Sequence, residues 1–139
     1  MADLGLARYK RHTFLSGAEG LRGTLPWMAP ELVRSPGAVD ERADVFAFGI
    51  VLWEIWAGAV PHQALDECAI LAGLMNHKLR PPIACIEGGP SIPLPHPCWQ
   101  GLMTDCWDED PNRRPHFATV LGILERAKEG SGHACTYVR

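Results

Sequence analysis

The chain has 139 residues, of which 47% are hydrophobic and 21% are charged, and its formal net charge is −3 at pH 7. These values are typical of an ordinary globular domain, and a chain of this length is expected to fold around one hydrophobic core. The small negative charge excludes a broad basic surface of the kind that attracts nucleic acid or anionic lipid, so we expect no nucleic-acid partner.

Cysteine usage and the apolar runs bear on the cell compartment. The five cysteines are an odd number and include no Cys-x-x-Cys pair, which argues against a disulfide framework and against a zinc site. The longest apolar run, residues 45–53, is far shorter than the roughly 18 residues that a membrane-spanning helix needs. The first residues do not read as a signal sequence. These features predict a cytoplasmic protein with no membrane partner.

The first half of the chain predicts a long loop followed by a buried helix. Residues 1–38 are rich in Gly, Pro and small polar residues and lack periodicity, apart from one helical turn expected over 30–33. A loop of this length is usually functional or disordered. Residues 41–57 predict a helix, because Asp40 can cap its start and Gly58 follows its end. This helix is apolar on every face, so we expect it at the centre of the core.

Three further helices are predicted after this central helix. Residues 66–76 begin at a capping Asp66, and residues 97–107 and 116–128 show the same one-sided apolar spacing. The positions that this spacing places on one face are Ile70, Leu71, Leu74 and Met75, then Trp99, Leu102, Met103 and Cys106, then Phe117, Val120, Leu121 and Leu124. Residues 129–139 predict a short flexible tail. The expected fold class is therefore mainly α, with about four helices behind a long leading loop.

Four motifs give the chain a family resemblance. Residues 3–5 read Asp-Leu-Gly, and residues 23–31 read Gly-Thr-Leu-Pro-Trp-Met-Ala-Pro-Glu. Residues 44–54 read Asp-Val-Phe-Ala-Phe-Gly-Ile-Val-Leu-Trp-Glu, and residues 106–117 read Cys-Trp-Asp-Glu-Asp-Pro-Asn-Arg-Arg-Pro-His-Phe. In this order the motifs resemble a protein kinase from its activation segment (residues 3–31) onward, and they are most similar to the tyrosine-kinase-like group of serine/threonine kinases. The resemblance implies the helical portion of a kinase C-lobe, as a partial kinase domain over residues 1–128.

The resemblance implies a cofactor for the first motif. Asp3 would hold Mg²⁺ on the phosphates of ATP, and Gly5 would allow the sharp backbone turn beside it. The Gly-rich loop, strand lysine, helix glutamate and His-Arg-Asp catalytic loop of a kinase do not occur among the 139 residues. We therefore expect no catalytic residue in this chain. The fragment alone is expected to be inactive, with the chemistry mainly upstream.

The resemblance also implies a surface for protein substrates. Residues 13–31 would form the segment that docks a protein substrate, with Thr24 and Trp27 inside it. Thr13 and Ser16 follow a basic stretch, so phosphate added there by a regulatory kinase could pair with the basic side chains and order the loop. A mobile basic loop without this modification is the alternative interpretation.

Three residues are expected to have structural roles. In the family that the chain resembles, Glu31 would form a buried ion pair with Arg114, whose planar fork can donate two parallel hydrogen bonds to a carboxylate. Asp44 lies in the first turn of the central helix, where the helix dipole favours a carboxylate. In kinases the equivalent Asp also braces the catalytic loop, and we expect the structural role for Asp44 here.

Three interpretations of the function follow from these observations. The chain is part of an ATP-dependent kinase that phosphorylates Ser or Thr of protein substrates. Alternatively, it is a non-catalytic, pseudokinase-like helical module that binds a partner through uncovered apolar surface on the central helix. The third interpretation is a truncated gene product.

Overall fold

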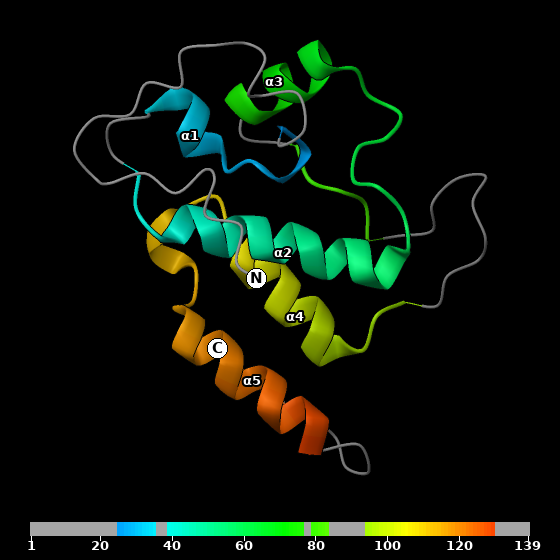
Figure 1. Ribbon diagram of the computed structural model, residues 1–139, viewed down its shortest axis with the longest axis vertical. Helices are drawn as coiled ribbons and strands as arrows, with labels where there is room; N and C mark the ends of the chain where they lie inside the picture. The colour runs from blue at the N-terminus through cyan, green and yellow to red at the C-terminus, as the bar shows by residue number, and fades with distance from the viewer. Residues whose placement is uncertain (1–24, 36–38, 77–78, 84–93, 130–139) are drawn as a thin grey trace, which may run out of the picture.

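The computed structural model describes residues 25–35, 39–76, 79–83 and 94–129 (Figure 1). The described part is helical and contains no strand, which confirms the expected mainly α fold. Its elements are η1 (Leu25–Trp27), α1 (Pro30–Arg34), α2 (Arg42–Ala57), α3 (Glu67–Met75), α4 (Pro97–Cys106), η3 (Pro111–Arg113) and α5 (Phe117–Glu129). None of the described helices is both long enough and apolar enough to cross a bilayer.

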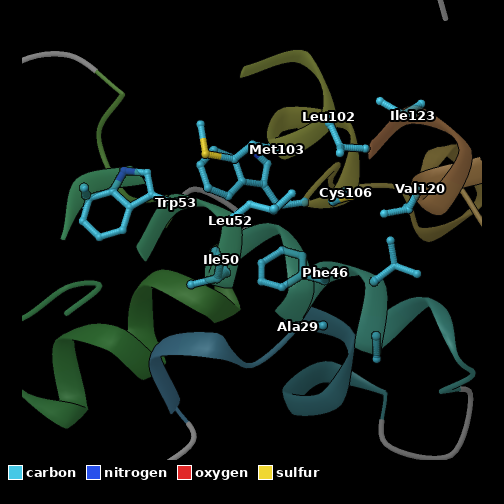
Figure 2. Close-up of a cluster of buried hydrophobic side chains, with 14 residues drawn as sticks. Ala29, Phe46, Ile50, Leu52, Trp53, Leu102, Met103, Cys106, Val120 and Ile123 are labelled. Atoms are coloured by element: carbon cyan, nitrogen blue, oxygen red, sulfur yellow. The ribbon is translucent and has the colours of Figure 1, made fainter. Parts of the chain in front are cut away.

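Helix α2 lies at the centre of the molecule. Figure 1 shows α1 and α3 on one side of α2, with α4 and α5 on the other side. The main hydrophobic cluster is built around α2, and Figure 2 shows its side chains between Ala29 and those of α4 and α5. Its buried members are Ala29, Ala43, Val45, Phe46, Ile50, Leu52, Trp53, Ala57, Leu102, Met103, Cys106, Trp107, Val120 and Ile123. These neighbours on both sides explain most of the all-round apolar sequence of α2. The exception is Ile55, which is 65% exposed, so this face of the helix is not covered, in contrast to the sequence prediction.

The two ends of α2 are determined by local hydrogen bonds. Asp40 Oδ1 accepts a hydrogen bond from the backbone N–H of Arg42 at 3.0 Å, which satisfies one of the unpaired donors of the first turn. At the other end Gly58 adopts a left-handed φ of 61°, and its N–H donates to the carbonyl of Glu54 at 2.8 Å. Glycine takes this conformation without a Cβ penalty, so the helix stops there.

A second, smaller apolar cluster joins η1 and α3. Leu25 and Met28 pack against Ile70 and Leu74, with three partly buried side chains around them. Asp66 begins α3 as expected, because its side chain accepts a hydrogen bond from the N–H of Ala69 at 2.7 Å. The segment before α2 is thereby packed on α3 rather than only on the main core.

The outer helices bury less of their predicted apolar faces than the spacing indicates. In α5 Val120 and Ile123 are buried, whereas Phe117 and Leu121 are 45% and 57% exposed. The reason is that α5 packs chiefly on α4, and α4 covers only part of the apolar face of α5. The ring of Phe117 still meets Phe48 edge-on, with ring centroids 5.9 Å apart. In the same way, α3 buries its inner positions but leaves Leu71 and Met75 exposed.

The crossing of α2 and α4 gives a test of this packing. A Cβ added at Gly49 would lie 2.9 Å from Cys106 Cβ and 3.1 Å from both Met103 O and Trp107 N. Because two of these atoms are backbone, the neighbours cannot move aside easily. We expect Gly49→Ala to lower the free energy of unfolding by about 1–3 kcal/mol, measured by urea denaturation of the whole protein.

A matched substitution in α5 serves as the control. A Cβ at Gly122 would meet only the end of the Arg126 side chain, at 3.5 Å. Gly122→Ala should therefore leave stability unchanged or raise it by up to about 1 kcal/mol, through the better helix propensity of alanine. Equal effects of the two substitutions would contradict the proposed close approach of α2 and α4.

Candidate functional site

The structure describes part of the site predicted from the sequence. The predicted residues outside the described part are Asp3, Gly5, Thr13, Ser16 and Thr24. Trp27, Glu31, Asp44 and Arg114 lie within it. The side chains of Glu31 and Arg114 form an ion pair. Asp44 lies exposed in the first turn of α2, and Trp27 donates a hydrogen bond to Glu54.

The predicted ion pair between Glu31 and Arg114 is present. Arg114 Nη1 donates to Glu31 Oε1, and Nη2 donates to Oε2 at 3.0 Å, so the pair has the two-pronged geometry expected for arginine. The Arg114 side chain is fully buried, and that of Glu31 is 17% exposed. Arg114 also donates from Nε to the carbonyl of Asp108 and from Nη1 to the carbonyl of Arg42, each at 2.9 Å. One guanidinium therefore joins α1, the start of α2 and the loop after α4.

An aromatic ring lies beneath this charge cluster. The guanidinium carbons of Arg80 and Arg114 lie 4.7 Å and 5.0 Å from the ring centroid of Phe46, which gives each a cation–π contact. Burial lowers the pKa of Arg80 to about 10, and the positive charge of Arg114 acts in the same direction. Arg80 still carries its charge at neutral pH, and it is held in a partly desolvated position.

Trp27 makes a second polar link to the central helix. Its indole N–H donates to Glu54 Oε2 at 3.0 Å, and both side chains are half-buried. Trp27 belongs to the segment expected to dock a substrate, and Glu54 lies in the last turns of α2. Glu54 is a partner that was not predicted from the sequence. The signal was a single acidic side chain in an otherwise apolar stretch of helix, which is costly to bury unless it is paired.

The described residues also include side chains of metal-binding and nucleophilic types. Within them, no group of three or more His, Cys, Asp or Glu side chains is placed to hold a metal ion. Cys106 is buried, and burial, together with the negative charge of Asp105, raises the pKa of its thiol to about 12. The thiol is therefore neutral at physiological pH. The described helices instead hold residues 25–34 in place through the Trp27–Glu54 hydrogen bond and the Glu31–Arg114 ion pair.

Comparison with known proteins identifies relatives of the chain. Residues 1–124 match the family described as protein tyrosine and serine/threonine kinase. The chain is 41% identical over 129 residues to mitogen-activated protein kinase kinase kinase 11 of Homo sapiens, and 36% identical over 129 residues to mitogen-activated protein kinase kinase kinase 10 of Mus musculus. It is 38% identical over 126 residues to the protein named Probable serine/threonine-protein kinase drkC of Dictyostelium discoideum. These alignments cover 90% of the chain but only 12% to 16% of the relatives.

The buried ion pair predicts a large loss of stability when one partner changes. Glu31→Gln leaves the fully buried charge of Arg114 without its carboxylate, and we expect the free energy of unfolding to fall by about 3 kcal/mol. The measurement is urea unfolding of the whole protein. Glu41→Gln is the control, because Glu41 is exposed and makes no capping hydrogen bond with its side chain. Similar losses in the two variants would show that the pair contributes little.

The cysteines predict a difference in reactivity that follows from burial. At pH 8 iodoacetamide should label exposed Cys68 and leave Cys106 unmodified, because alkylation needs the thiolate and a pKa of about 12 keeps Cys106 protonated. In urea both thiols should react. Peptide mass spectrometry gives the labelled fractions, and equal labelling of the two cysteines in the folded protein would refute the buried placement of Cys106.

Proposed function

The chain belongs to the protein tyrosine and serine/threonine kinase family, and from this premise we propose that it is the part of an ATP-dependent protein kinase that supports the substrate-docking segment. The whole enzyme would phosphorylate Ser or Thr of protein substrates. The names of the relatives, which include a serine/threonine-protein kinase, support this choice of residue. The observation that carries the proposal is the ion pair of Glu31 and Arg114, which fixes the end of that segment to the helical core.

ATP and Mg²⁺ are the proposed cofactors of the complete domain. Asp3 would coordinate Mg²⁺ and Gly5 would form the adjacent turn, in an enzyme whose remaining catalytic groups are outside this sequence. The described residues do not form a metal site, so we assign no step of phosphoryl transfer to them. Their role in the proposal is to bind and orient.

Positioning is the main requirement of this chemistry. Phosphoryl transfer depends on holding the acceptor hydroxyl in line with the phosphate, so a small displacement of the acceptor slows the reaction strongly. In the proposed enzyme two polar links hold the described part of the substrate segment, residues 25–31, on the core. Trp27 is bonded to Glu54 on α2, and Glu31 is bonded to Arg114. Both links lie in the last residues of the segment.

Regulation is proposed for the first part of the same segment. Thr13 and Ser16 are candidate sites for a regulatory kinase, and Arg8, Lys10 and Arg11 are near enough in sequence to pair with an added phosphate. Such pairing would order the segment that presents the substrate, as charge-assisted hydrogen bonds do in other switches. The proposal rests on the order of basic and hydroxyl residues in the sequence.

The alternative function, a non-catalytic module that binds a partner, has one observation in its favour. Ile55 on α2 and Leu121 on α5 are 65% and 57% exposed, so apolar surface is available on these helices. Exposed apolar surface is compatible with both proposals. An activity assay separates them.

The proposed activity is tested with the whole protein that contains these residues. We expect Mg²⁺-dependent transfer of the γ-phosphoryl group of ATP to Ser or Thr of a protein substrate, detected with labelled ATP and phosphoamino-acid analysis. Asp3→Asn should reduce the rate by about a hundredfold or more, because a neutral amide holds Mg²⁺ poorly. The 139-residue chain alone should show no turnover.

A matched variant controls for loss of folding in this assay. Asp66→Asn also replaces an aspartate, but Asn caps a helix about as well as Asp, so α3 and the activity should be retained. No transfer by the wild-type protein would favour the pseudokinase-like alternative. Full activity of Asp3→Asn would contradict the role proposed for Asp3.

A further inference from the structure

One carboxylate in the loop after α4 bridges two arginines from different elements. Glu109 Oε1 accepts a hydrogen bond from Arg34 Nη2 at 2.9 Å, and Glu109 Oε2 accepts one from Arg80 Nη2 at 3.1 Å. Arg34 is the last residue of α1, and Arg80 lies in the segment that follows α3. We refer to these three residues as the Glu109 bridge.

Both arginines of the Glu109 bridge are also bonded to backbone. Arg34 donates from Nε and Nη2 to the carbonyl of Leu74 near the end of α3, at 3.3 and 3.2 Å. Arg80 donates from Nε to the carbonyl of Trp107 at 3.0 Å. These bonds fix the guanidinium groups, so Glu109 contacts two positioned cations rather than two mobile side chains. The bridge thereby joins α1, the end of α3 and the loop after α4.

The charges around the Glu109 bridge explain why a carboxylate is needed there. The side chains of Arg34 and Arg80 are only 23% and 20% exposed, so solvent screens them incompletely. Arg80 is also repelled by the charges of Arg114 and Arg34, which Asp108 and Glu31 oppose from the other elements packed around it. Removing the negative charge of Glu109 would leave these cations close together with less compensation. We expect α1 and the segment after α3 to move apart to relieve that repulsion.

The bridge acts on the layer that carries the end of the substrate segment. We define the docking layer as residues 25–34 and 67–75, which comprise η1, α1 and α3. The docking layer has its own small apolar cluster, and Figure 1 shows α1 and α3 together on the side of α2 opposite α5. Its polar links to the rest of the molecule include the Trp27–Glu54 bond, the Glu31–Arg114 pair and the Glu109 bridge. Of these three links, only the Glu109 bridge contacts both α1 and the segment after α3.

We propose that Glu109 is a positioning residue for the protein substrate, because its bridge to Arg34 and Arg80 sets the place of the docking layer relative to the core. This inference rests on the proposed function, since the docking layer is taken to contact substrate. Glu109 touches neither ATP nor the reacting atoms in this account. In this inference the docking layer contributes to the affinity for the protein substrate, whereas other groups of the enzyme align the acceptor hydroxyl with the phosphate. The expected effect is therefore on the KM for the protein substrate and not on kcat.

The test is steady-state kinetics of the whole protein with Glu109→Gln, which keeps the shape of the side chain and removes its charge. We expect the KM for the protein substrate to rise about three- to tenfold, while kcat and the KM for ATP change less than about twofold. Arg34→Gln should give the same pattern. The double variant should be no worse than the worse single variant, because the two substitutions break one bridge.

Glu125→Gln is the matched control, since Glu125 is exposed on α5, and Figure 1 shows α5 on the side of α2 opposite the docking layer. It should behave as the wild type. An unchanged KM for protein substrate in Glu109→Gln would overturn the inference, and so would a parallel fall of kcat, ATP affinity and thermal stability. If Glu109→Gln fails to fold, Arg34→Gln decides by the same kinetic criteria. An inactive wild-type protein would instead overturn the proposed function, and the inference with it.

Discussion

The ion pair between Glu31 and Arg114 is the interaction on which the arrangement of the other elements depends. Helix α1 has five residues, of which Pro30 alone is buried, and so short a helix has no stability of its own. It is held in place because its carboxylate meets a fully buried guanidinium from a segment 83 positions later. The same guanidinium bonds the carbonyls of Arg42 and Asp108, so it also fixes the start of α2 and the loop after α4. Loss of the carboxylate would leave a buried charge at the junction of all three.

Apolar packing and polar contacts stabilise different parts of this molecule. The main core is apolar: α2 is covered on both sides, and its packing with α4 is close enough to require glycine at position 49. The docking layer has a much smaller apolar cluster of its own. It is joined to the core by Ala29, which is buried in the main cluster, and by half-buried charged and polar contacts. Such contacts are directional and depend on geometry, whereas apolar burial is not directional. This division is consistent with the proposed function, in which the segment presents a substrate in one orientation while the helices beneath it stay rigid.

The sequence was sufficient for the elements and for one long-range contact. Caps at Asp66 and Gly58 predicted where helices begin and end, and the all-round apolar pattern of residues 41–57 predicted the central helix. The pairing of Glu31 with Arg114 came from family resemblance, because no spacing rule connects residues so far apart. The partners of Trp27 and Glu109 could not be found in this way, since they depend on how the helices pack. Periodicity likewise gives the apolar face of α5, but not how much of that face α4 covers.

Among the contacts of η1 and α1, the buried pair of Glu31 and Arg114 contributes most to holding these two elements on the helical core. Amide hydrogen exchange of the whole protein, compared between the wild type and Arg114→Lys, tests this claim directly, because lysine keeps the charge but cannot make the two-pronged contact. We expect faster exchange for the amides of η1, α1 and the first turn of α2, with the protection of the rest of α2 and of α4 retained. Unchanged protection of α1, or an equal loss of protection in all four elements, would contradict it.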